Sequence, residues 1–99
     1  MKDYSKMSDF EIDKAVSTAL GMDVSGATEE NNIMYGCFDD ICNNPSDAWY
    51  VMEENKIGIA FVNGEWRASS VMAGYHEYSD KNALRAAMIV YLMMKDEEK

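Results

Sequence analysis

Residues 82–94, NALRAAMIVYLMM, are the most informative segment of the chain for its architecture. Apolar side chains occupy nearly every side of a helix drawn through it, whereas a helix on the surface of a domain is polar on one side. The run includes Arg85 and is shorter than the roughly 20 apolar residues that span a bilayer. We therefore predict a helix that begins after Asn82 or Asp80 and is buried on all sides in a protein core.

A chain of 99 residues has the size of one small domain, so we expect a single domain over residues 1–99. If so short a chain leaves part of the apolar helix uncovered, the remaining apolar strip predicts a homodimer through the C-terminal helix.

A hairpin precedes this helix. KIGIAFV and EWRASSV flank Asn63-Gly64, a pair that suits a two-residue turn because both residues tolerate positive φ. Pairing across the turn sets Val62 opposite Glu65, Phe61 opposite Trp66 and Ile59 opposite Ala68. One face of the hairpin is predicted to meet the core, and it carries Ile57, Ile59, Phe61, Trp66 and Ala68. A weaker third strand follows Gly74 in YHEYS.

Two further helices are indicated by their caps. Ser8 and Glu11 form a capping box for a helix over residues 9–20, which Gly21 ends. Asn44-Pro45 begins another helix that runs to about Glu54. Residues 22–43 show no sustained periodicity and are predicted to form a long variable loop. The fold class is therefore α+β: a small antiparallel sheet of two or three strands packed with three helices, in the order α-α-β-β-(β)-α.

The charge balance restricts the partners. Asp and Glu number 18 against 9 Lys and Arg, for a net charge of -9. Such a surface repels phosphates, so we expect no direct nucleic-acid binding and no membrane binding. The acidic surface either imitates nucleic acid in a basic groove of another protein or only keeps the protein soluble.

The sequence offers no convincing catalytic or metal set, so we expect no enzyme activity, no cofactor and no metal. His76 is the one histidine, and Glu77 beside it points to the opposite face of a strand. Cys37 and Cys42 lack the spacing of a redox pair and are expected to be free thiols in a reducing cytoplasm. Asp39-Asp40 lacks the spacing of a calcium loop.

Three blocks of the chain carry a family resemblance: YSKMSDFEIDKAVSTALG, CNNPSDAWYVMEENKIGI and NALRAAMIVYLMM. Together and in this order they resemble the NinX-type proteins of lambdoid bacteriophages, a family related to the phage α-β-α sandwich domains. Ala83 stands where that family commonly has proline. The resemblance implies a phage or prophage origin, a cytoplasmic location in the bacterial host and an accessory role. It carries over no catalytic residue.

From these observations we predict a non-enzymatic phage accessory protein that binds and inhibits a host defence or regulatory complex. Its partner would be a host protein, such as one that binds nucleic acid. The alternatives are a protein that sequesters a nucleotide signal and a structural or assembly factor with no host target. Trp49 and Trp66 are each either core residues or binding platforms. The candidate partner-binding residues are Glu29, Glu30, Asp39, Asp40, Trp49, Glu53, Glu54, Arg67, Tyr75 and His76.

Overall fold

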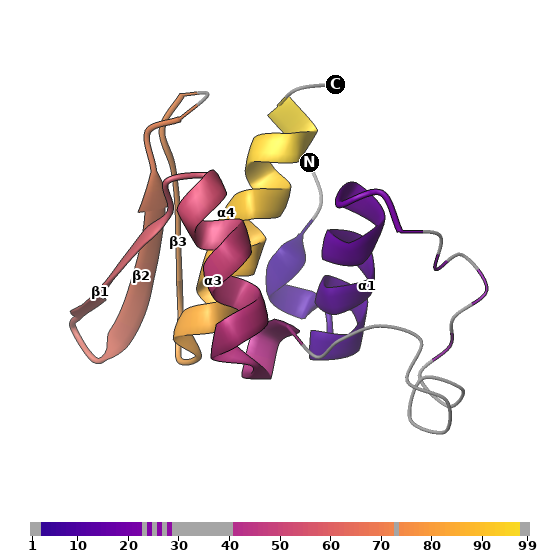
Figure 1. The fold of residues 1–99 in the computed structure, drawn as a ribbon. Helices are drawn as coiled ribbons and strands as arrows, with labels where there is room; N and C mark the ends of the chain where they lie inside the picture. Colours follow the sequence, from indigo (N-terminus) through magenta and orange to yellow (C-terminus); the bar gives the residue numbers. More distant parts are fainter. Residues whose placement is uncertain are drawn as a thin grey trace.

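The computed structural model of the chain describes residues 3–22, 24, 26, 28, 41–72 and 74–97. Their order of elements confirms the predicted α+β fold, third strand included (Figure 1). The elements are η1 (Tyr4–Lys6), α1 (Asp9–Ala19), η2 (Ile41–Asn43), α3 (Pro45–Glu54), β1 (Gly58–Val62), β2 (Glu65–Ser70), β3 (His76–Asp80) and α4 (Ala83–Glu97). The predicted loop over 22–43 lies largely outside the described residues.

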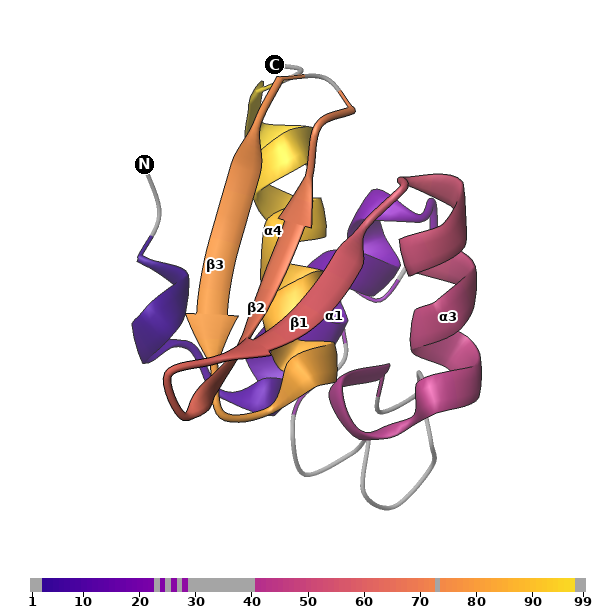
Figure 2. The ribbon, with the colours of Figure 1, turned by 90° about the vertical axis from the view of Figure 1, so that its left-hand side faces the viewer.

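The sheet has the predicted hairpin register. Phe61 pairs with Trp66 across a turn in which Asn63 and Gly64 have φ of 53° and 85°. β3 pairs antiparallel with the other side of β2, so β2 is central and the order is β1-β2-β3. Figure 2 views the sheet from its outer face, where none of the described helices covers the strands.

Helix α4 is the centre of the core. The side chains from Ala86 to Leu92, and Met94, are all buried, which confirms that this helix is covered on all sides. Figure 1 shows α4 between the sheet and α1, with α3 alongside, and all three helices run in the same direction. One chain buries this run by itself. In the part of the chain that the structure describes, no helix is long and apolar enough to cross a membrane.

The prediction for the core face of the hairpin was right for β2 and wrong for β1. Ala68 is fully buried and Trp66 half-buried, but Ile59 is 39% exposed and Phe61 62% exposed. β1 is an edge strand, and α4 packs mainly on β2 and β3 behind the sheet (Figure 2). The inner face of β1 therefore extends beyond the helix that covers its neighbours. Phe61 contacts Trp66 edge to face, with ring centroids 5.3 Å apart.

The helix caps are those that the sequence predicts. Ser8 and Glu11 form the capping box of α1, with both hydrogen bonds at 3.1 Å. The Asn44 side chain accepts a hydrogen bond from the backbone amide of Ser46 at the start of α3. The Asn82 side chain accepts a hydrogen bond of 2.9 Å from the backbone amide of Leu84 at the start of α4. Local capping chemistry thus fixes where each helix begins.

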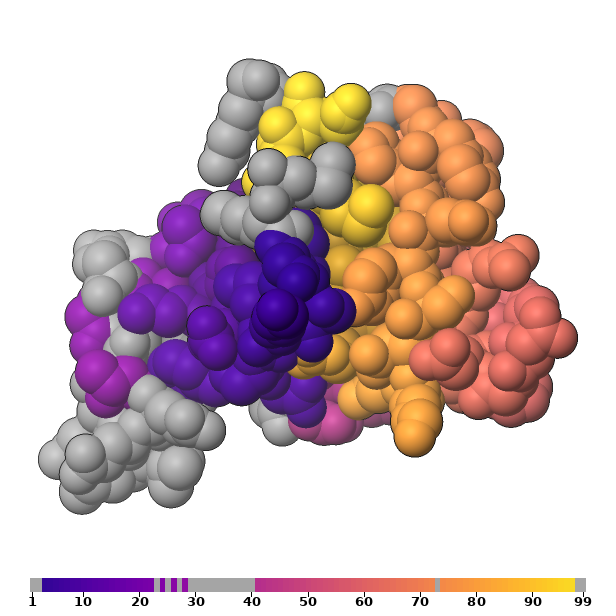
Figure 3. Space-filling view, turned by 180° about the vertical axis from the view of Figure 1, so that it is seen from behind, coloured from indigo at the N-terminus to yellow at the C-terminus, as the bar shows by residue number. Residues whose placement is uncertain are grey.

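The N-terminal segment is tied to α4 by polar side chains. Arg85 donates to the carbonyl oxygens of Tyr4 and Met7, and the Tyr4 hydroxyl donates to Asp96 near the end of α4. Figure 3 shows the N-terminal residues lying against the C-terminal half of the chain. The two ends of the described chain therefore close the same core.

A second buried polar contact joins α1 to η2. Asp13 is only 3% exposed, and its Oδ1 accepts the backbone amide of Cys42 at 2.9 Å. This bond anchors the segment that leads into α3, because Cys42 lies just before the Asn44 cap.

Candidate interaction surface

Helix α3 presents aromatic side chains to solvent. Its inner side is anchored in the core by Ala48, Val51 and Met52, which are all buried. The opposite side carries Trp49 and Tyr50, which are 57% and 73% exposed. Exposed aromatic residues of this size are typical of binding surfaces, since they bury a large area when a partner covers them.

The same helix is acidic. Its sequence, PSDAWYVMEE, contains Asp47, Glu53 and Glu54 and no lysine or arginine. Glu53 and Glu54 are exposed. A shallow hollow of about 660 Å³ is lined by Pro45, Ser46, Trp49, Tyr50 and Glu53. We call the exposed group Trp49, Tyr50, Glu53 and Glu54 the α3 face.

The structure brings together three of the predicted site residues. Trp49, Glu53 and Glu54 all belong to the α3 face. For Trp49 the sequence left open a core position or a binding surface, and the structure places this side chain on the surface. The predicted acidic residues Glu29, Glu30, Asp39 and Asp40 lie outside the described residues. Their role in partner binding stays a prediction.

Two other predicted residues, Arg67 and His76, lie on the sheet instead, and Tyr75 directly precedes β3. Arg67 points to the outer face, as predicted, and its Nε is 3.7 Å from Oε2 of Glu77 on β3. The Tyr75 hydroxyl donates to the same Glu77 oxygen at 2.7 Å, and this hydrogen bond raises the pKa of Tyr75. Arg67 and Tyr75 are thus engaged with a carboxylate of their own chain.

His76 lies at the start of β3, next to the end of α4. It lines a hollow of about 470 Å³ with Tyr75, Met93, Asp96 and Glu97. Its Nδ1 is buried and has no hydrogen-bond partner among the described residues. A catalytic histidine is oriented by such a partner, so this geometry does not favour a general base.

The buried thiol is also unsuited to nucleophilic chemistry. Cys42 is free and fully buried, and burial together with the neighbouring Asp13 raises the pKa of its thiol. A reactive cysteine needs a lowered pKa and access to solvent. Within the described ranges, no three His, Cys, Asp or Glu residues are grouped so that they could hold a metal ion.

Sequence reasoning missed part of the exposed apolar surface. Tyr50 was not among the predicted residues, although the buried positions 48, 51 and 52 place residue 50 on the outer side of a helix. Ile59 and Phe61 were assigned to the core because strand alternation shows which face a residue is on. It does not show how far the covering helix extends.

Comparison with known proteins agrees with the resemblance seen in the three sequence blocks. No curated protein and no solved structure matches the chain. The family model described as bacteriophage P22 NinX matches residues 3–95, which includes every helix and strand except the last residues of α4. The chain therefore belongs to the NinX family of bacteriophage P22.

Proposed function

We propose that this phage protein acts by binding and not by catalysis, and that it inhibits a host defence or regulatory complex. In this proposal the acidic surface occupies a basic groove that otherwise binds nucleic acid. The observation that carries the proposal is the α3 face, where exposed aromatic rings lie beside carboxylates on a helix without basic residues.

The α3 face has the chemistry that a basic partner requires. Glu53 and Glu54 attract lysine and arginine, and the rings of Trp49 and Tyr50 can stack against the cations or their apolar stems. The net charge of -9 adds long-range attraction to a positive groove. Tryptophan and tyrosine are among the residues most enriched in binding hot spots.

The sequestration of a nucleotide signal is supported less well. Phosphate groups are bound by clustered cationic or amide donors. Arg85 is 11% exposed and paired with Asp9, and Arg67 is 3.7 Å from Glu77. These two arginines are already held by carboxylates of their own chain.

The first experiment is a native mass spectrum of the tagged protein purified gently from host lysate. A stoichiometric host protein supports the inhibitor function and identifies its target. A homodimer with a small added mass supports sequestration. A monomer or a bare dimer would leave the structural or assembly role and contradict our proposal.

Once a target is known, its affinity should fall steeply as salt rises, because an electrostatic mimic depends on charge attraction. Glu53→Gln should weaken binding, whereas Glu65→Gln, with the same charge change at the hairpin turn, should not. Replacing Asp39 and Asp40 with Asn tests the acidic residues outside the described part. Equal effects of Glu53→Gln and Glu65→Gln would show that net charge acts without the α3 face.

A further inference from the structure

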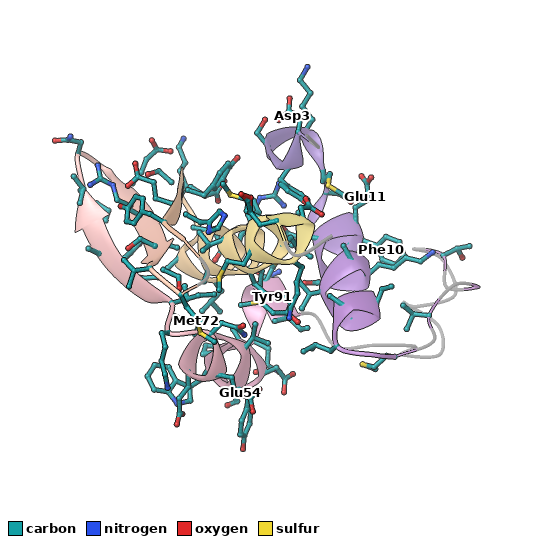
Figure 4. The ribbon with its side chains drawn as sticks, turned by 90° about the horizontal axis from the view of Figure 1, so that it is seen from above. Asp3, Phe10, Glu11, Glu54, Met72 and Tyr91 are labelled. Atoms are coloured by element: carbon teal, nitrogen blue, oxygen red, sulfur yellow. The ribbon has the colours of Figure 1, made fainter. Side chains whose placement is uncertain are left out.

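A cavity lies between α1, α3 and α4, on the side of α3 that faces the other two helices. Its volume is about 300 Å³, at the lower end of the range for small-molecule sites. Leu20 directly after α1, Ile41 of η2 and Val51 of α3 contribute apolar side chains to its walls. Figure 4 shows Tyr91 of α4 and Glu54 of α3, which also line it, projecting from neighbouring helices.

One buried polar atom in the wall of this cavity lacks a partner among the described residues. Ser17 is 1% exposed, and its Oγ makes no hydrogen bond with any residue that the structure describes. A buried hydroxyl without a partner costs free energy, and a ligand atom that hydrogen-bonds to it recovers that cost. Ser17 is one of the residues that line the cavity, so a ligand that enters there comes close to this unpaired hydroxyl.

The electrostatics of the cavity favour a positive charge. Ser17 and Leu20 lie at the C-terminal end of α1, and Val51 and Glu54 lie at the C-terminal end of α3. Helix C-termini carry partial negative charge, and the Glu54 carboxylate adds to it. Lys95 is a cation in the lining, and its ammonium already lies over the Tyr91 ring, 5.4 Å from the centroid.

We propose that this cavity binds a small cationic amine with an aromatic or other apolar body and one polar atom at its far end. The ammonium group would lie near Glu54 at the exposed side, and the polar atom would hydrogen-bond to Ser17. The cavity shares Tyr50 and Glu54 with the edge of the α3 face, whereas Trp49 and Glu53 do not line it. The proposal does not depend on the host target.

Tyramine is the probe for this proposal, because it has an ammonium group, an aromatic ring and a hydroxyl at the opposite end. Two matched compounds isolate its ends. 2-Phenylethylamine lacks the hydroxyl, and 4-hydroxyphenylacetate replaces the ammonium with a carboxylate. Titration of the ¹⁵N-labelled full chain should shift the amide signals of Ser17, Val51 and Asn55 with tyramine. The carboxylate should bind at least about fivefold more weakly, because its charge is repelled.

The variants separate hydrogen bonding from charge. Ser17→Ala should weaken the binding of tyramine by about two- to tenfold, as expected for one lost hydrogen bond. The binding of 2-phenylethylamine should not change. Glu54→Gln should weaken the binding of both amines by about two- to fivefold. Glu53→Gln is the control, since it has the same charge change one residue away and does not line the cavity.

Several results would overturn the proposal. The first is that no amide signal shifts at about 10 mM tyramine, a concentration at which even weak specific binding is detected. The second is that 4-hydroxyphenylacetate binds as tightly as tyramine. The third is that Glu53→Gln and Glu54→Gln weaken tyramine binding equally. Equal weakening of both amines by Ser17→Ala would rule out the hydrogen bond. The ¹⁵N spectrum of each variant shows directly that it is folded.

Discussion

Asp9 in α1 and Arg85 in α4 lie 76 residues apart in the chain and form an ion pair, with 2.8 Å between Oδ1 and Nη1. The same guanidinium group donates to two backbone carbonyls before α1, and its Nε is 3.6 Å from Asp80. One arginine therefore connects the start of α1, the end of β3 and the start of α4. The cation that interrupts the apolar helix is a structural residue.

Replacing Arg85 with methionine should strongly destabilise the fold. The change leaves partly buried carbonyl and carboxylate groups without their donor, so we expect a loss of about 3 kcal/mol in the free energy of unfolding. Urea denaturation measures it. Arg67→Met is the control, because the Arg67–Glu77 pair is exposed and its loss should cost about 0.5 kcal/mol. Similar costs for the two variants would contradict this role of Arg85.

Asp13 should be needed as a hydrogen-bond acceptor more than as a charge. Asp13→Ala leaves the buried Cys42 amide without the partner that it has at 2.9 Å, which should cost about 1 to 3 kcal/mol. Asp13→Asn retains an oxygen acceptor and should cost less. Thermal unfolding of both variants tests this order, and amide exchange at Cys42 should accelerate in Asp13→Ala alone.

The protein should lose stability in alkaline solution. Burial raises the pKa of Cys42 above its ordinary value of 9.0, and burial also raises the pKa of Tyr4, aided by its hydrogen bond to Asp96. The folded state thus holds protons that the unfolded chain releases. Stability is retained below pH 9 and falls as the pH rises above it, by up to about 1.4 kcal/mol per pH unit for Cys42.

Urea denaturation at pH 8 and pH 10.5 checks this dependence. Cys42→Ala should be less stable than the parent at pH 8, because it leaves a cavity, yet it should lose less stability between the two pH values. A parent protein equally stable at both would show that neither group titrates differently in the folded state. In the same pH range, Cys42 should resist alkylation until the protein unfolds, as peptide mapping would show.

The α3 face should be dispensable for folding. Trp49→Ala removes a side chain that is 57% exposed, so we expect a change in stability within about 0.5 kcal/mol. Binding to a host target should fall at least about fivefold if Trp49 is an anchor. Val51→Ala, on the buried side of the same helix, should show the reverse order, with a larger loss of stability. Unfolding of Trp49→Ala would instead make this tryptophan structural.

The features that follow from local chemistry could be predicted from the sequence. Ser8, Asn44 and Asn82 mark their helices because a cap depends on residues two or three positions away. The Asn63-Gly64 turn likewise sets the pairing register of β1 and β2 through local geometry. The exposure of Phe61 depends on the reach of α4, and the bonds of Arg85 join segments that only the tertiary fold brings together. The cavity beside Ser17 likewise needs three helices in place before it exists.

The central position of α4 also determines when the protein can fold during synthesis. α4 follows every other described element, yet it contacts α1, α3 and each strand of the sheet. A nascent chain ending before residue 83 would hold a hairpin, a third strand and two amphipathic helices with no common core to pack on. The domain can fold cooperatively only after α4 has left the ribosome, because α1, α3 and the sheet all pack on it. Until then the strands and helices remain open to host chaperones and proteases.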